Sequence, residues 1–201
     1  MGSNYFTSPL AFIITTLFDL YILLVLLRFI LQMLRADFYN TVSQFIVKMT
    51  TPPLKVLRRF IPSMLGQDSA AIVLCLLIIY AKFVLLRVLD ISVIAIADVP
   101  APIGLVSYAG LLIYCIADLA SLFISIFLVA CIIQVVISWI NPGQYNPIIG
   151  LVNTITAPIL RPIQKRLPAM GGFDFSTMVA ILVLMVGKML IIPPIIQLGS
   201  F

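Results

Sequence analysis

The chain has 201 residues, of which 63% are hydrophobic and only 9% charged, and its mean hydropathy is +1.23. The 12 Lys and Arg residues and 7 acidic residues cannot supply the charged exterior of a soluble fold, so a water-soluble globular protein is excluded. The sequence therefore predicts one integral membrane domain over residues 1–201, without a separate soluble domain.

The first predicted element is a membrane-spanning helix over residues 10–34. No Lys or Arg precedes Arg28, and no small-residue cleavage site follows a short apolar core, so this segment is expected to be a retained span rather than a signal peptide. From the helical rise, Asp19 lies about 23 Å from the end of this span. Arg28 lies about 10 Å from the same end, where its side chain is expected to snorkel to the surface.

The second element, residues 35–67, is predicted to lie in the membrane interface. Asn40 is expected to begin a new helix, and Pro52 to end or kink it before a second short helix that reaches about residue 61. On that short helix the cations fall on one side and the apolar residues on the other, which is typical of an interfacial helix that contacts anionic headgroups. The cations are Lys55, Arg58 and Arg59.

A turn containing Pro62 and Gly66 then returns the chain to the bilayer, and residues 69–90 form the second predicted span. Asp68 is a natural N-cap of this span. The alternative is that its carboxylate faces the basic helices. Lys82 lies about 21 Å beyond Asp68, in the same layer as Asp19, which makes these two residues the expected ion pair.

Residues 91–114 are interrupted by Asp98, Pro100 and Pro102, so they are predicted to be a connection lying partly in the interface on the non-cytoplasmic side. A fifth span there would place the two basic blocks on opposite sides of the membrane. The third predicted span covers residues 115–140 and contains Asp118. Its small-residue stripe allows another helix of this chain, or a second copy, to approach closely; the stripe comprises Ala117, Ser121 and Ser125.

From residue 107 the sequence repeats the first unit at a constant offset of 106, so residues 1–95 and 107–201 are two tandem copies. The second interfacial segment covers residues 141–173, and a fourth span covers 175–198. Lys82 recurs as Lys188, whereas Asp19 becomes Ser125. Lys188 is therefore expected to share Asp19, to pair with Asp118 from a higher layer, or to snorkel. The repeated block keeps the cations Arg161, Lys165 and Arg166 and the turn and cap residues Pro158, Pro168, Gly172 and Asp174.

The predicted fold is thus an all-α membrane protein of about four transmembrane helices, arranged as two tandem parallel repeats of span, interfacial helix and span. Eight cations lie in the two basic blocks, and the first nine and last thirteen residues carry none. By the positive-inside rule both blocks are expected in the cytoplasm and both termini in the periplasm or outside the cell.

An enzyme is not expected, because the chain has no His, no Glu and no nucleotide-binding or metal-ligand motif. No catalytic residue, metal site or cofactor is assigned. The three cysteines lie in apolar runs without CxxC spacing, which favours packing; they are Cys75, Cys115 and Cys131. Direct nucleic-acid binding is not expected.

The chain resembles the YggT (YlmG) family of small membrane proteins. The resemblance rests on the segment from Pro158 to Ser176, on its first copy from Pro52 to Asp68, and on Asp19, Tyr21 and Arg28 in the first span. The resemblance covers nearly the whole chain. Departures include Thr177, where the family often has proline, and Pro53 and Val56 in the first copy. It implies a non-enzymatic inner-membrane protein, with relatives linked to division and envelope organisation, plastid haem attachment and osmotic stress. Without His, direct haem ligation would fall to Met or Cys.

Two functions follow as hypotheses. In the first, the basic interfacial helices organise or assemble envelope or division components by contacting anionic lipid and a protein partner. In the second, the charged layer of Asp19, Lys82, Lys188 and Asp118 belongs to an ion-permeation or ion-homeostasis component. The spans contain few polar residues that could line an ion pathway, which favours the first hypothesis.

Overall fold

The computed structural model describes residues 3–36, 40–61, 67–140, 147–166 and 175–200. In these residues the chain forms six helices and one pair of short strands. The elements are α1 (Ser3–Met33), α2 (Thr41–Leu57), α3 (Ser69–Val88), β1 (Ile94–Ile96), β2 (Val99–Ala101), α4 (Tyr108–Ile140), α5 (Pro147–Gln164) and α6 (Phe175–Gly199).

Four of these helices are long and apolar enough to cross a membrane, which confirms the predicted number of spans. They cover Pro9–Met33, Ser69–Val88, Tyr108–Ser138 and Phe175–Gly199. The predicted bounds hold to within two residues for the first, second and fourth spans, but the third begins at Tyr108 instead of residue 115. The protein is therefore an integral membrane protein built largely of helices.

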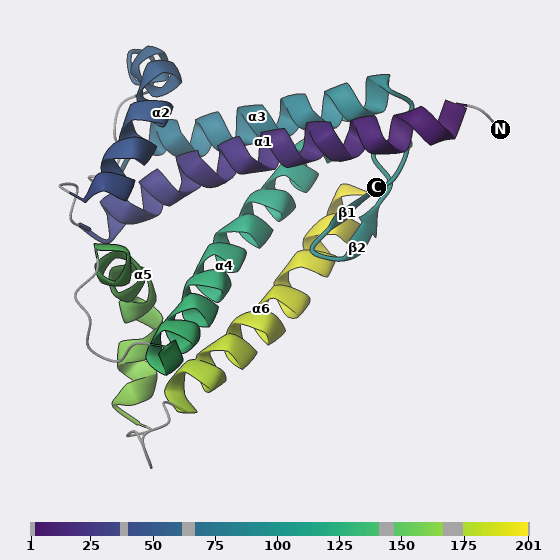
Figure 1. The fold of residues 1–201 in the computed structure, drawn as a ribbon. Coiled ribbons are helices and arrows are strands. Elements are labelled where there is room, and N and C mark those ends of the chain that lie inside the picture. The colour runs from purple at the N-terminus through teal and green to yellow at the C-terminus, as the bar shows by residue number, and fades with distance from the viewer. Residues whose placement is uncertain (1–2, 37–39, 62–66, 141–146, 167–174, 201) are drawn as a thin grey trace.

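The two repeats form two helix pairs, α1 with α3 and α4 with α6, and α3 contacts α4 to join them (Figure 1). The pairs diverge from the end that holds both termini toward the end that holds α2 and α5 (Figure 1). We call these the terminal end and the interfacial end. Both interfacial helices therefore lie at the same end of the molecule, as two repeats of parallel orientation require.

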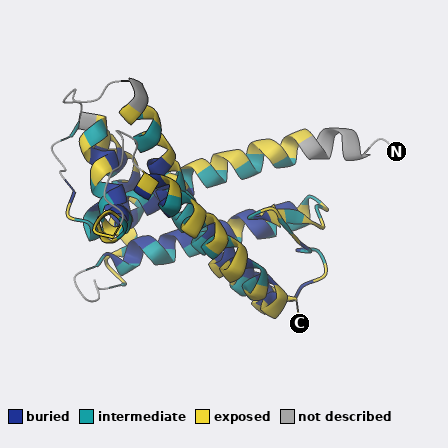
Figure 2. Ribbon diagram, turned by 90° about the horizontal axis from the view of Figure 1, so that it is seen from below, coloured by how far each residue is buried: buried dark blue, intermediate teal, exposed yellow. Residues whose placement is uncertain are grey.

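Buried residues gather where the helix pairs face each other, and the outer faces of the long helices stay exposed (Figure 2). Within its span α3 is 44% buried, against 17% for α1 and α6, so α3 is the most enclosed of the four spans. The exposed outer faces are apolar, as helices that contact lipid tails require. A charged side chain on α3 is consequently more enclosed by protein than one on another span, and it depends more on protein partners to balance its charge.

The interfacial helices are longer than predicted, because α2 continues through Pro52 and Pro53, and α5 through Pro158 and Pro162. The expected break into two short helices is wrong. In α2 one buried stripe runs past the prolines and packs against the spans; it comprises Ser43, Ile46, Thr50 and Leu54. Burial of this stripe outweighs the two backbone hydrogen bonds that the prolines remove.

The connection between the repeats contains an antiparallel hairpin in which Ile96 pairs with Val99. The two residues of its turn, Ala97 and Asp98, have φ of 53° and 66°, as a two-residue hairpin turn of the primed type requires. The interruption predicted for residues 91–114 is thus a folded hairpin followed by the first turns of α4, and the described residues contain no fifth span. Ile96 is buried, which seats the hairpin on the terminal end.

Candidate functional site

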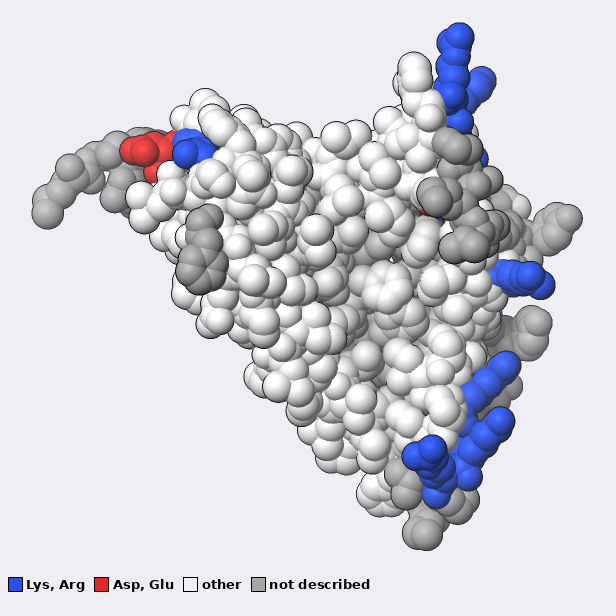
Figure 3. All heavy atoms as spheres, turned by 180° about the vertical axis from the view of Figure 1, so that it is seen from behind, with Lys and Arg blue, Asp and Glu red and all other residues white. Residues whose placement is uncertain are grey.

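The cations of the two basic blocks are exposed and lie at the interfacial end. Figure 3 shows Lys and Arg gathered along this end, while most of the remaining visible surface is uncharged. The six cations predicted to contact the membrane surface or a partner lie on α2 and α5 or directly after these helices. All are exposed: Lys55, Arg58, Arg59, Arg161, Lys165 and Arg166. Arg166 follows the end of α5 and is exposed.

Asp68 does not act as the predicted side-chain cap. It holds the N-cap position of α3, but its side chain makes no capping hydrogen bond. Its carboxylate instead accepts hydrogen bonds from the guanidinium of Arg58, with Asp68 buried and the Arg58 side chain 44% exposed. The alternative of a carboxylate facing the basic helix is therefore the observed one. This ion pair fixes the end of the basic segment to the start of α3.

The other predicted turn and cap residues divide between two groups. Pro52 and Pro158 lie inside α2 and α5. The remainder fall outside the described residues; they are Pro62, Gly66, Pro168, Gly172 and Asp174.

The charged layer is centred on Lys82 of α3. Its Nζ lies 2.6 Å from Asp19 Oδ1 of α1 and 2.7 Å from Asp118 Oδ2 of α4, so it donates to two carboxylates. Side-chain exposure is 4% for Lys82, 12% for Asp118 and 41% for Asp19. The expected contact of Asp19 with Lys82 is present, and Asp118 joins it from the other repeat. We call these three residues the triad; it ties the two repeats together and combines two carboxyl groups with one amine.

Lys188 does not reach either acid. Its Nζ donates to Ser125 Oγ at 3.0 Å, which is the contact that the repeat register predicts from Lys82 and Asp19. The expected ion pair of Lys188 with Asp19 or Asp118 is therefore absent among the described residues. Ser125 belongs to the small-residue stripe, whose other members, Ala117 and Ser121, are buried within the chain. The stripe packs the chain's own helices.

Arg28 has a role that sequence reasoning missed. Its side chain is expected to snorkel, yet the residue is only 7% exposed. Its Nη1 donates to Thr50 Oγ1 and Thr51 Oγ1, both at 2.9 Å, and to the carbonyl oxygen of Val47 at 3.2 Å, which holds α1 against α2.

The second repeat makes the equivalent contact with neutral groups. Arg28 corresponds to Gln134 and Thr50 to Thr156, and the Thr156 hydroxyl donates to Gln134 Oε1. Recurrence of a polar residue at both positions was the signal that could have revealed this contact. In each unit, the span and its interfacial helix are joined at the same point.

A cavity of about 310 Å³ lies between the hairpin and the triad and is lined by Asp19, Lys82 and Asp118 together with residues of α1, α3 and β1. It gives the triad access from the terminal end. On the other side the described core is closed, because Ile22 and Ile79, one turn from Asp19 and Lys82, are fully buried. The arrangement offers charge pairing and a polar recess. Within the described residues no group of His, Cys, Asp or Glu is placed to hold a metal ion.

Comparison with known proteins gives a consistent match over both repeats. A family model described as CCB3/YggT matches residues 7–89 and again residues 113–195, so both ends of the match are displaced by 106 residues. An uncharacterized protein of Pseudomonas aeruginosa is 45% identical over 182 residues, covering 90% of this chain and 87% of the relative.

Two further relatives are more distant. The uncharacterized protein YggT of Escherichia coli K12 is 36% identical over 90% of this chain and 88% of its own length. An uncharacterized protein of Haemophilus influenzae is 34% identical over 89% of this chain and 88% of the relative. No solved structure matches the chain.

Proposed function

The chain belongs to the CCB3/YggT family, and we propose that it is a non-enzymatic inner-membrane protein that organises or assembles envelope or division components through its basic interfacial helices. The observation that carries this proposal is the position of the exposed cations. They extend along α2 and α5 at one end of the molecule instead of lining a cavity that crosses it (Figure 3).

The buried stripes of α2 and α5 support the same proposal. In α2, Ile46 and Leu54 are at most 2% exposed and Lys55 and Arg59 are exposed, so the helix is held by its apolar side while its cations face outward. In α5, Leu160 is buried beside the exposed Arg161. Such a surface attracts anionic headgroups at about 1 kcal/mol per cation, or an acidic segment of a protein partner. By the positive-inside rule it faces the cytoplasm, with both termini on the other side.

The proposal is tested by reversing the exposed charges. The variant changes four residues that form no ion pair within the described residues: Lys55→Glu, Arg59→Glu, Arg161→Glu and Lys165→Glu. Arg58 is left unchanged because it holds Asp68. A photocrosslinking residue at Val56, which is 62% exposed, is expected to capture a protein partner in native membranes, and the reversal is expected to abolish that adduct.

The matched control places the crosslinking residue at Leu105, which is 90% exposed at the terminal end and should give no such adduct. Orientation of the reversed variant is checked by labelling, because loss of cations can also invert a membrane protein. Unchanged adducts from Val56 in a correctly oriented variant would contradict the proposal.

A second candidate, an ion-permeation or ion-homeostasis component, is favoured by the cavity over the triad. Two observations argue against ion permeation. The cavity is closed on the interfacial side by the fully buried Ile22 and Ile79, and both carboxylates already accept hydrogen bonds from Lys82. A sodium or potassium current in liposomes that disappears in the Asp19→Asn variant would favour this second candidate over the first.

A further inference from the structure

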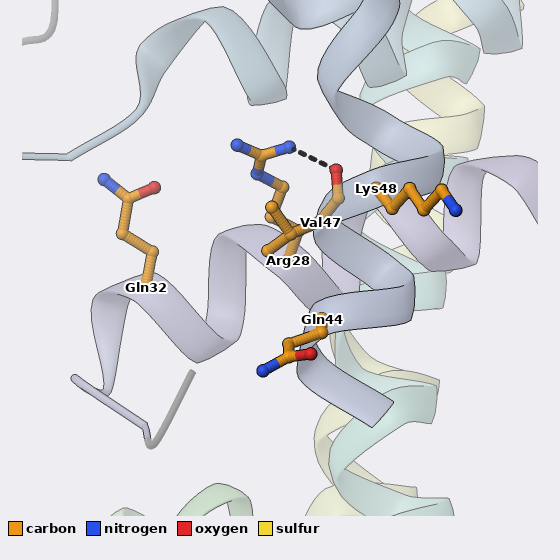
Figure 4. Close-up of a pocket in the computed structure, with 5 residues that line it drawn as sticks. All are labelled: Arg28, Gln32, Gln44, Val47 and Lys48. Carbon is orange, nitrogen blue, oxygen red and sulfur yellow. Dashed lines mark hydrogen bonds between the residues drawn. The ribbon is translucent and has the colours of Figure 1, made fainter. Parts of the chain in front are cut away.

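A second cavity, of about 450 Å³, lies between α1 and α2 at the interfacial end (Figure 4). It is lined by Arg28 and Gln32 of α1 and by Gln44, Val47 and Lys48 of α2. Four of these five side chains carry N–H donors, and none is acidic. The lining is therefore suited to a ligand that accepts hydrogen bonds and carries negative charge.

Arg28 is the charged group at the centre of this lining. Within the described residues its guanidinium donates hydrogen bonds through Nη1, which leaves Nε and Nη2 as donors for a ligand. In Figure 4, Nη1 is turned to the Val47 carbonyl, and the opposite side of the guanidinium is turned toward the side where Gln32 lies. Three contacts to α2 hold the guanidinium in place, so the donor edge is set before any ligand arrives.

Arg28 forms no ion pair in the described residues, and the two charges that act on it, Arg58 and Asp68, are paired with each other. Its partners are a carbonyl and two hydroxyls, and the described ion pairs belong to Arg58 and Lys82. A buried guanidinium without a counter-charge is costly, and a bound anion removes that cost. Lys48 extends along the other side of α2 in Figure 4, so it adds positive charge near the cavity but is not placed to contact a ligand beside Arg28.

The second repeat shows that helix packing does not require this charge. Gln134 replaces Arg28 and still contacts Thr156, the counterpart of Thr50. The other lining positions differ as well: Gln32, Gln44 and Lys48 correspond to Ser138, Gly150 and Thr154, so the second repeat lacks their amide N–H donors and the ammonium. The buried guanidinium and its amide neighbours are thus particular to the first repeat, and a function other than joining α1 to α2 is needed to explain them.

We propose that this cavity binds a phosphate group, with Nε and Nη2 of Arg28 donating to two of its oxygens and the amide of Gln32 completing the contact. Paired donation from guanidinium to phosphate is the geometry that distinguishes Arg from Lys as a phosphate ligand. Arg28 lies five residues before Met33, about 8 Å from the end of α1, which is the depth of a lipid headgroup. The phosphate comes from an anionic lipid or from solution.

The test uses the purified full chain in detergent and measures retention of phosphatidylglycerol by native mass spectrometry. Arg28→Gln, which copies the second repeat, is expected to weaken retention of one lipid at least about tenfold. Gln32→Glu places a carboxylate beside Arg28 without touching its contacts to α2, so it is expected to displace the lipid. Its matched control, Ser138→Glu at the same position of the second repeat, adds the same charge and should leave retention unchanged.

Inorganic phosphate identifies the source of the ligand. Competition by millimolar phosphate would show that the soluble ion binds, and its failure to compete would assign the site to the lipid headgroup. Unchanged lipid retention in both Arg28→Gln and Gln32→Glu would overturn the proposal, as would an equal loss in Ser138→Glu. This inference goes beyond the proposed function: the cavity includes none of the four residues reversed in the partner test, so either proposal can fail alone.

Discussion

Replacement of Lys82 by methionine is expected to lower the free energy of unfolding by about 3–5 kcal/mol. Lys82 donates to Asp19 at 2.6 Å and to Asp118 at 2.7 Å, and the variant would leave both carboxylates without a cation. Methionine fills a similar volume, so the loss reports the charge and not a void. Unfolding in mixed micelles, followed by circular dichroism, measures the effect.

Lys188→Met is the matched control, because Lys188 holds the same position in the second repeat but donates only to Ser125 among its described contacts. We expect a loss of about 1 kcal/mol there. Adding Asp118→Asn to Lys82→Met should recover part of the lost stability, since one of the unpaired charges is removed. Equal losses for Lys82→Met and Lys188→Met would contradict the account of the triad as the tie between the repeats.

Replacement of Gly110 by alanine is expected to destabilise the protein by about 1–3 kcal/mol by separating α4 from α6. A Cβ added at Gly110 would overlap the carbonyl oxygen of Gly199 and a methyl group of Val106. A Cβ at Gly199 would lie 2.7 Å from the ring of Tyr114. The two helices therefore approach at backbone distance, where the carbonyl of Gly199 cannot move aside as a flexible side chain could.

Gly187→Ala in α6 is the control for this prediction. No atom lies within 4 Å of a Cβ built there, so the substitution adds a methyl group without a clash and should not lower the unfolding midpoint. If Gly110→Ala has the same midpoint as Gly187→Ala, the close approach of α4 and α6 is not a determinant of stability.

The spans, their number and the duplication could be predicted because apolar length and the 106-residue offset are local properties of the sequence. The same register predicts contacts inside each unit. Lys82 donates to Asp19 in the first unit, and Lys188 donates to Ser125, the counterpart of Asp19, in the second. In the same way, the contact between Arg28 and Thr50 recurs between Gln134 and Thr156. Contacts within a repeat are thus encoded twice.

Contacts between the repeats are not encoded in that register. Asp118 was expected in a higher layer than the other charges, and the third span was expected to begin at residue 115. It begins at Tyr108, so Asp118 lies ten residues into the helix, about 15 Å, and reaches Lys82. Asp68 likewise had two competing local roles, and only the position of Arg58 decides between them.

Helix propensity also misled the prediction at the prolines. Pro52 and Pro53 are unfavourable inside a helix, but Thr50 and Leu54, on either side of them, are both buried against the spans. The gain from that burial depends on the neighbouring helices and is not visible in a local window of sequence. For the same reason the buried position of Arg28 could not be anticipated from its distance to the end of α1.

The central claim is that both basic interfacial helices work at the cytoplasmic surface, and accessibility labelling of an engineered cysteine tests it most directly. The native Cys75, Cys115 and Cys131 are buried and should give little background. With Gln164→Cys on α5, an impermeant thiol reagent added outside intact cells should give no label, whereas Leu105→Cys at the terminal end should react. Labelling of Gln164→Cys from outside, with Leu105→Cys protected, would contradict the account.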